Sequence, residues 1–242
     1  MRAWLQSRMN EVRDYFPEVE PYVLGRGVPE VVAHRLGMGM WPDEDPATEA
    51  PNADFCDRYG TLGERLSGKL TTPIYSPRGD LMGFEARSME EKKLTRFLLP
   101  HAEWNPVFLG LDQTTTRAIH EGANVWIGEG IFDLGALCHA VPTGDVVLAS
   151  MWARLSRKHV EFLRRWSRGL ISMVYDEDET GRKGVLGAID PDTKKRRWGA
   201  LESLRFVGLE CRDVRYRGGK DVGEIWERSG TTGLKEALNN YL

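Results

Sequence analysis

The stretches VWIGEGIFD, residues 125–133, and LISMVYDEDETG, residues 170–181, decide how this chain folds. In each, an apolar run typical of a buried strand ends directly in acidic residues, and a segment of helical character follows. Carboxylates at the ends of buried strands are costly unless a partner neutralises them. Several converging carboxylates are typical of a site for a hard divalent cation such as Mg²⁺. The two stretches therefore indicate a metal site suited to phosphoryl chemistry.

Strand and helix patterns alternate around these two stretches. We expect strands at 125–128, 146–150, 170–175 and 211–216, and helices at 131–139, 155–167 and from about 181. Alternation of this kind implies a parallel sheet covered by helices. Right-handed crossovers bring the carboxyl ends of all its strands to one edge, where open α/β sheets bind ligands. Both acidic stretches are expected at that edge.

The amino-terminal part has a different pattern. We expect helices from residue 1 to about 40, the last of them a short helix closed by Gly37, and then an exposed acidic, proline-rich loop at 41–54. A hairpin of strands 71–75 and 81–87 should follow. Residues 94–111 are expected to form a short extended segment and a turn, and residues 114–124 a helix ending at Gly122. Residues 190–200 are predicted to form a loop, and its basic run, 194–197, is expected to serve mainly to keep the loop solvated. Residues 224–242 are predicted to form one or two short amphipathic helices. The predicted fold is therefore a mixed α/β amino-terminal lobe (1–120), a lobe with a central parallel sheet flanked by helices (121–225) and a short helical tail (226–242).

Composition narrows the class of protein. The chain has 242 residues and a formal net charge of −3, so no bulk excess of positive charge advertises nucleic-acid binding. Its three cysteines, Cys56, Cys138 and Cys211, are scattered and give neither a disulfide framework nor a zinc spacing. No apolar segment reads as a signal or a membrane span. We expect a cytoplasmic protein without membrane contact.

The order of the motifs resembles a known family. A glutamate after one strand and Asp-x-Asp-x-x-Gly after a later one are similar to the Toprim signature of primases, topoisomerases and some nucleases. The flanking blocks YVLGRGVPE (22–30), PIYSPRGDLMGFEAR (73–87) and RFLLP (96–100), with the pair Lys220-Asp221, resemble the polymerase core of DnaG-type primases. The resemblance runs in order from about residue 21 to 228. It implies a Toprim fold for the second lobe.

The resemblance also implies an activity and a set of site residues. The activity is that of a DNA primase, a template-directed DNA-dependent RNA polymerase that makes short RNA primers on single-stranded DNA by two-metal nucleotidyl transfer. The implied catalytic residues are Glu129 (general base or further ligand), Asp176 and Asp178. The ligands of Mg²⁺ or Mn²⁺ would be Glu129, Asp133, Asp176, Asp178 and Asp221. Nucleotides or template would be held by Arg26, Arg65, Arg87, Arg96, Lys183 and Lys220.

Departures from the family pattern leave other functions open. Glu177 stands where glycine is usual, and Asp221-Val222-Gly223 lacks one acid of the common Asp-Pro-Asp. The resemblance implies a replicative helicase and a zinc-module protein as partners in trans, beside single-stranded DNA and nucleoside triphosphates. It also suggests a phage or mobile-element source in a bacterial host cytoplasm. The alternatives are a Toprim metal-dependent nuclease and a non-catalytic single-stranded-DNA-binding replisome component.

The tryptophans add one further expectation. Trp104, Trp126, Trp152 and Trp166 are predicted to be core side chains rather than platforms on which bases stack.

Overall fold

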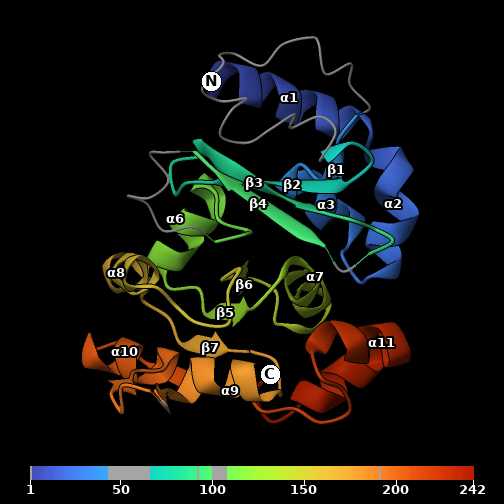
Figure 1. Cartoon of the computed structure of the whole chain (residues 1–242). Helices are drawn as coiled ribbons and strands as arrows, with labels where there is room; N and C mark the ends of the chain where they lie inside the picture. The colour runs from blue at the N-terminus through green and yellow to red at the C-terminus, as the bar shows by residue number, and fades with distance from the viewer. Residues whose placement is uncertain (1, 43–65, 92, 100–107, 191) are drawn as a thin grey trace.

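A computed structural model describes residues 2–42, 66–91, 93–99, 108–190 and 192–242. It has two lobes, each built on its own sheet (Figure 1). We call them the antiparallel lobe and the parallel lobe, after the direction of their strands. Together they give the mixed α/β architecture that the sequence predicts.

The antiparallel lobe holds a sheet of four strands in the order β1-β2-β3-β4. Its elements are α1 (Arg2–Asp14), α2 (Phe16–Gly25), α3 (Glu30–Leu36), β1 (Gly39–Met40), β2 (Leu70–Tyr75), β3 (Leu81–Arg87) and β4 (Leu94–Leu98). Helix α1 lies over the sheet on the side away from the parallel lobe (Figure 1). The predicted hairpin is confirmed: Ser76 N–H donates to the Asp80 carbonyl at 2.8 Å, and Gly79 adopts a φ of +82° in the turn.

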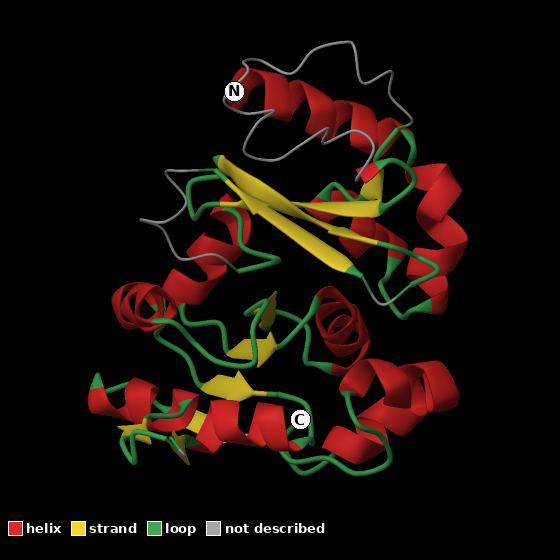
Figure 2. Cartoon of the chain, in the orientation of Figure 1, coloured by secondary structure: helices red, strands yellow, loops and turns green. Residues whose placement is uncertain are grey.

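The parallel lobe holds a second sheet of four strands, ordered β10-β7-β5-β6 and parallel throughout. Its elements are α6 (Gln113–Glu121), β5 (Val125–Gly128), α7 (Ile131–Ala140), β6 (Val146–Ala149), α8 (Arg157–Trp166), β7 (Ile171–Met173), α9 (Glu179–Leu186), β8 (Ala188–Ile189), β9 (Arg196–Arg197), α10 (Ala200–Phe206), β10 (Cys211–Asp213) and α11 (Val222–Leu238). Strands β8 and β9 form a separate small antiparallel hairpin (Figure 2).

Alternating side chains of the parallel strands pack into two different cores. In β5, Val125 and Ile127 belong to the core covered by α6, α8, α9 and α10. Trp126, between them, belongs to the core that contains α7 and α11. The strands are therefore apolar on both faces, as expected for a parallel sheet covered by helices.

The core beneath α7 is shared between the two lobes. It joins Val23 and Val28 of the antiparallel lobe to Leu134 of α7 and Leu234 of α11. The contact is close at Gly135, where a Cβ atom would lie 2.6 Å from Val28 Cγ2 and 2.9 Å from the Gly27 carbonyl oxygen. Glycine at this position lets the backbone of α7 approach the antiparallel lobe directly.

Several predicted boundaries differ from the structure. The predicted strands 170–175 and 211–216 are shorter, β7 ending at Met173 and β10 at Asp213. Tyr175 lies beyond the strand but stays buried, because its hydroxyl donates to Ser150 Oγ at 2.7 Å. The tail lies in α11, in which two helical stretches meet at the non-helical Gly230, as the prediction of one or two helices allows; α11 begins two residues earlier than predicted and packs on α7. The domain boundaries at residues 120 and 225 stay predictions.

The predicted exposed loop at 41–54 is wrong at its first two residues, because Trp41 and Pro42 are both buried. Trp41 is fully buried, its N–H donates to the Lys69 carbonyl at 2.9 Å, and its ring packs on Phe84 at 5.3 Å. It extends the antiparallel pairing of β1 with the start of β2. The rest of the predicted loop, 43–54, lies outside the described residues.

Candidate active site

The predicted acids lie at the carboxyl edge of the parallel sheet. Glu129 follows β5 and Asp176 follows β7, and the Glu129 carboxylate accepts a hydrogen bond from the Asp176 N–H at 3.1 Å. Asp178 is the N-cap of α9, accepting from Gly181 N–H at 2.9 Å. Asp221 is the N-cap of α11, accepting from Glu224 N–H at 2.7 Å. Helix N-termini favour negative charge, so two of these acids are also held by helix dipoles.

Asp133 is the buried member of the set. It lies in the first turn of α7 and accepts from Gly130 N–H at 2.9 Å. Burial, with repulsion from Asp176 and Asp221, raises the pKa of Asp133 to about 8. This carboxyl is therefore largely protonated at neutral pH unless a cation binds near it.

The other acids of the edge influence one another as well. Burial, followed by repulsion from Asp176, raises the pKa of Glu129 to about 7. Burial and the neighbouring Asp221 also raise the pKa of Asp176. Asp178 differs, because the hydrogen bond from the Gly181 N–H lowers its pKa. The edge therefore concentrates more negative charge than its surroundings neutralise.

Lys220 is the cation in contact with this cluster. Its Nζ lies 3.4 Å from Asp176 Oδ2 and 3.2 Å from Asp178 Oδ2. The hydrogen bond to Asp178 and the charge of Asp176 raise the pKa of Lys220. It bridges two of the predicted metal ligands and lines the cleft beside them.

A cleft of about 610 Å³ opens beside the acids, between the two lobes. Its lining includes Glu129, Asp133, Asp176, Lys220 and Asp221 from the parallel lobe, and Tyr22, Arg26, Glu85, Arg87 and Arg96 from the antiparallel lobe. The structure thus places the acids of the sheet edge on one wall, and on the other wall the three arginines together with Glu85, Glu90 and Glu91. Asp178, beside Lys220, lies just outside this lining.

Two of the predicted arginines converge on one aromatic ring. The guanidinium groups of Arg26 and Arg87 lie 4.2 and 4.9 Å from the ring centroid of Phe132. Arg26 also forms an ion pair with Glu227 of α11. Stacking on a ring holds a guanidinium in place while its N–H groups stay able to bind phosphate. The pair is therefore well placed to bind an anion in the cleft.

The remaining predicted cations differ in their surroundings. Arg96 donates two hydrogen bonds to the buried Glu85, at 3.0 and 2.7 Å, so its charge is matched within the wall of the cleft. Lys183 lies on α9, paired with Glu179 at 2.6 Å, and does not line the cleft. Arg65 lies outside the described residues.

Other cleft residues were not singled out by the sequence. Trp152, predicted as core, is 41% exposed and lines the cleft, with Arg96 stacked 4.8 Å from its ring centroid. Its partner comes from the other lobe, so no local pattern reveals this exposure. Trp126 is buried as predicted, Trp166 is partly buried, and Trp104 lies outside the described residues.

Glu177, which stands where the family usually has glycine, has a structural partner. Arg215 donates to both of its carboxylate oxygens, at 2.8 and 2.6 Å, and Tyr216 N–H approaches at 3.4 Å. The side chain therefore ties the loop after β7 to the segment that leads to Lys220. The departure leaves the acids of the edge in place.

The donor set fits a hard divalent cation. Carboxylates with raised pKa values lie close together at one edge of the sheet. Among the described residues, the hydrogen bond that the buried Asp133 accepts comes from the Gly130 N–H and not from a cationic side chain. As the described side chains stand, no three His, Cys, Asp or Glu residues form a group able to hold a metal ion. Mg²⁺ commonly uses only one or two carboxylates and completes its shell with water and substrate phosphates. The residues available at this edge meet that need.

Sequence comparisons find relatives that are named DNA primase. No known family model matches the sequence. The chain is 25% identical to the DNA primase of Deinococcus radiodurans over 93% of its own length and 41% of that protein, and 23% identical to the DNA primase of Aquifex aeolicus over 92% and 45%. The DNA primase of Neisseria meningitidis serogroup A is 28% identical over 72% of this chain and 31% of that protein. The chain thus spans less than half the length of these relatives.

Solved structures show the same fold. The DnaG catalytic core superposes with a TM-score of 0.69 at 18% identity, covering 97% of this chain and 79% of that one. The RNA polymerase domain of Mycobacterium tuberculosis primase DnaG gives 0.66 at 20%, covering 99% and 84%. A DnaG primase catalytic domain bound to single-stranded DNA gives 0.67 at 17%, covering 98% and 82%. The chain therefore has the fold of a DnaG-type primase catalytic core, and the resemblance to that fold seen in the sequence is confirmed.

None of the helices in the described parts of the chain is long and apolar enough to pass through a membrane.

Proposed function

We propose that the chain is the catalytic core of a DNA primase, which joins ribonucleoside triphosphates on a single-stranded DNA template. The observation that carries the proposal is the cleft, in which the acids of the parallel lobe face Arg26 and Arg87. The relatives named DNA primase, and the solved DnaG domain bound to single-stranded DNA, support the choice of substrate. Helicase and zinc-module partners in trans belong to the same proposal.

The acids would hold the divalent ions. Asp176, Asp178 and Asp221, with Asp133 behind them, provide oxygen ligands for Mg²⁺ or Mn²⁺ at one edge of the sheet. When bound, such ions stabilise negative charge on the attacking and leaving oxygens of a phosphoryl transfer. Lys220, which bridges Asp176 and Asp178, would have to share or yield these oxygens.

Glu129 is suited to accept the proton of the reaction. The 3′-hydroxyl of one nucleotide attacks the α-phosphate of the next, an O–P bond forms, and the bond to pyrophosphate breaks. The hydroxyl proton needs an acceptor. Burial and Asp176 raise the pKa of Glu129 to about 7 when no cation is bound, and a cation at the neighbouring acids would lower it, so that the carboxylate form would be available to accept the proton.

Arg26 and Arg87 would bind the phosphates. Both guanidinium groups lie against Phe132 in the first turn of α7, across the cleft from Asp176. Bidentate hydrogen bonding to phosphate orients the triphosphate and offsets its charge. Trp152, exposed in the same cleft, offers an apolar surface for a base.

The test is de novo synthesis on single-stranded DNA with labelled ribonucleotides and Mg²⁺ or Mn²⁺. We expect short labelled oligomers from the wild type, and a loss of about 100-fold or more in Asp176→Ala, because a removed metal ligand affects the charged transition state most. The matched control is Asp14→Ala, at an exposed aspartate of α1, which should retain full activity.

Two other results would replace the proposal. Degradation of the template that disappears in Asp176→Ala would establish a nuclease. DNA binding without synthesis or degradation, also with a helicase and a zinc-module protein added, would establish a non-catalytic binding component.

A further inference from the structure

The flank of the parallel lobe carries a basic and aromatic surface that the proposed reaction does not use. Residues 154–168 and 190–206 hold eleven lysines and arginines against four acidic residues, in a chain of net charge −3. Most of these basic side chains are exposed. We call the exposed side chains of these two segments the basic flank. Positive charge gathered on one face is the electrostatic signature of a surface that binds a polyanion.

Helix α8 supplies the first part of the basic flank. Its inner side, with Val160 and Phe162, packs into the core, and its outer side exposes Arg157, Arg164 and Arg165. Its one acid, Glu161, pairs with Arg157 at 2.7 Å. The outer side therefore keeps a net positive charge.

The β8–β9 hairpin and α10 supply the second part. Trp198 is 49% exposed and Phe206 75%, and their rings meet edge to face, with centroids 5.0 Å apart. Arg196, bonded to Glu202 at 3.1 Å, holds the hairpin against α10. With Arg205, these side chains line a shallow hollow of about 670 Å³. Exposed rings among guanidinium groups are the arrangement on which unpaired bases stack.

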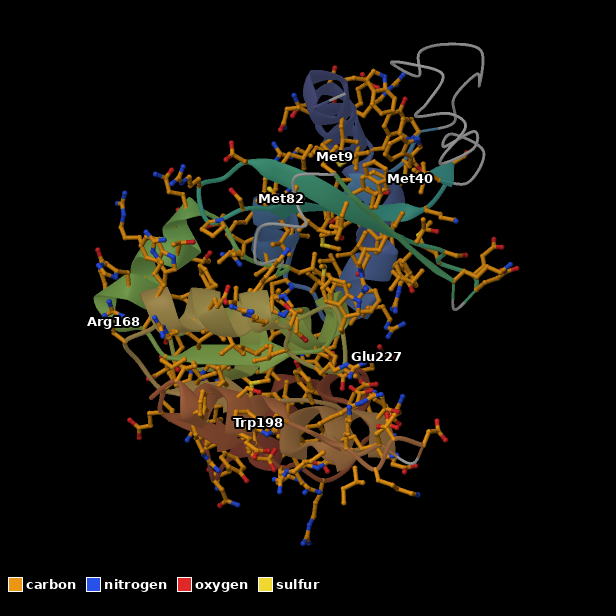
Figure 3. All side chains as sticks on the ribbon, turned by 60° about the vertical axis from the view of Figure 1, so that its left-hand side comes forward. Met9, Met40, Met82, Arg168, Trp198 and Glu227 are labelled. Atoms are coloured by element: carbon orange, nitrogen blue, oxygen red, sulfur yellow. The ribbon has the colours of Figure 1, made fainter. Side chains whose placement is uncertain are left out.

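The two parts are joined to each other and reach toward the active-site cleft. A second hollow, of about 640 Å³, lies between α8 and Val207, the residue after Phe206. At the other end of α8, Trp152 lines the active-site cleft and contacts His159 of α8, with ring centroids 5.9 Å apart. Helix α8 itself spans about 15 Å, which is the reach of a few nucleotides. Figure 3, turned to bring this flank forward, labels Arg168 and Trp198 on it.

We propose that the basic flank is a second binding surface for single-stranded DNA. The strand would leave the cleft beside Trp152, follow the arginines of α8 by its phosphates, and stack bases on Trp198 and Phe206. We choose a nucleic acid over a protein partner because the two segments carry eleven basic residues against four acidic ones, an excess that the phosphates of a strand would neutralise along its length. That this strand is the template of synthesis rests on the proposed function.

The test compares oligonucleotides of two lengths. Binding of fluorescent oligothymidylates of about 6 and about 30 nucleotides, sizes chosen from typical single-strand site sizes, is measured by anisotropy in EDTA without nucleotides. We expect the double variant Trp198→Ala/Phe206→Ala to bind the longer strand about 100-fold more weakly, since each of the two lost stacking contacts weakens binding by about ten-fold. The shorter strand, which the cleft alone can hold, should bind as in the wild type.

Charge variants and controls complete the test. Arg164→Glu/Arg165→Glu should weaken binding of the longer strand and reduce the slope of log K against log salt concentration by about 1.4, for two lost phosphate contacts. The control Tyr15→Ala/Val31→Ala removes two exposed apolar side chains from the antiparallel lobe and should change neither length.

Several outcomes would overturn the proposal: unchanged binding of the longer strand in both variants, an equal loss for both lengths, or a loss of self-association in sedimentation with DNA binding intact. Failure of the proposed function is separable, because it is read from primer synthesis. A wild type that makes no primers but shows the length-dependent loss would keep the basic flank as a DNA-binding surface.

Discussion

Replacing Asp133 by asparagine should remove a pH dependence of stability that the wild type shows without metal. Asp133 is buried, and burial with the nearby Asp176 and Asp221 raises its pKa from 3.8 to about 8. Because the folded-state pKa lies above the unfolded one, the folded state binds an extra proton between these values. The contribution of Asp133 to stability is then fully present below about pH 4 and is lost as the pH rises toward 8. Asparagine stays neutral throughout and can still accept the hydrogen bond from Gly130 N–H.

The size of the effect follows from the pKa difference. Each pKa unit corresponds to about 1.4 kcal/mol, so raising the pH from 5 to 8 should lower the free energy of unfolding by up to about 4 kcal/mol more in the wild type than in Asp133→Asn. Mg²⁺ binds the charged carboxylates and competes with protons, so it should restore wild-type stability most at pH 8. The variant should gain less from Mg²⁺.

The assay is urea unfolding between pH 5 and 9, in EDTA and in Mg²⁺, for the wild type, Asp133→Asn and the exposed control Asp14→Asn. Asp14→Asn should follow the wild type. Parallel pH curves for the wild type and Asp133→Asn in EDTA would refute the reasoning, because they would show that Asp133 does not hold a proton in the folded state.

Two further changes test the supports of the cleft. Gly181→Ala would place a Cβ atom 2.3 Å from the Asp176 carbonyl oxygen, so we expect the free energy of unfolding to fall by about 1–3 kcal/mol and Mg²⁺ to stabilise the variant less in thermal melts. The control Gly25→Ala, with nothing within 4 Å of the added Cβ, should be neutral. Equal melting temperatures for the two variants would contradict the tight packing at Gly181. Arg96→Met leaves the buried Glu85 without its partner and should cost about 3 kcal/mol in urea unfolding. Adding Glu85→Gln should recover part of that loss, and no recovery would show that the charge of Glu85 is not the cause.

Local sequence patterns were sufficient for the edge of the parallel sheet that carries the acids. The apolar runs 125–128 and 170–175 contain the neighbouring strands β5 and β7, and Glu129 and Asp176 follow these runs at the same edge. Right-handed crossovers and the order of the strands bring these acids together, and both are determined by short segments of the sequence. This is why the edge that carries them could be predicted before any contact was known.

Contacts between distant segments were not visible in the sequence. Trp41 follows the pattern of a loop but is buried, because Lys69 pairs with it and Phe84 packs on it. Trp152 reads as core but faces the cleft, beside Arg96 of the other lobe. Lys183 sits beside the acidic segment in sequence, yet the helical spacing pairs it with Glu179 instead.

The core shared beneath α7 makes the two lobes one cooperative unit. Val28 contacts α7 at Gly135 with no room for a larger side chain, and Leu234 of α11 closes the same core. A fragment that begins near residue 121 would expose this apolar surface to water. The lobes should therefore unfold in a single transition, and a lobe taken from a relative would fit only if both sides of the joint were exchanged together.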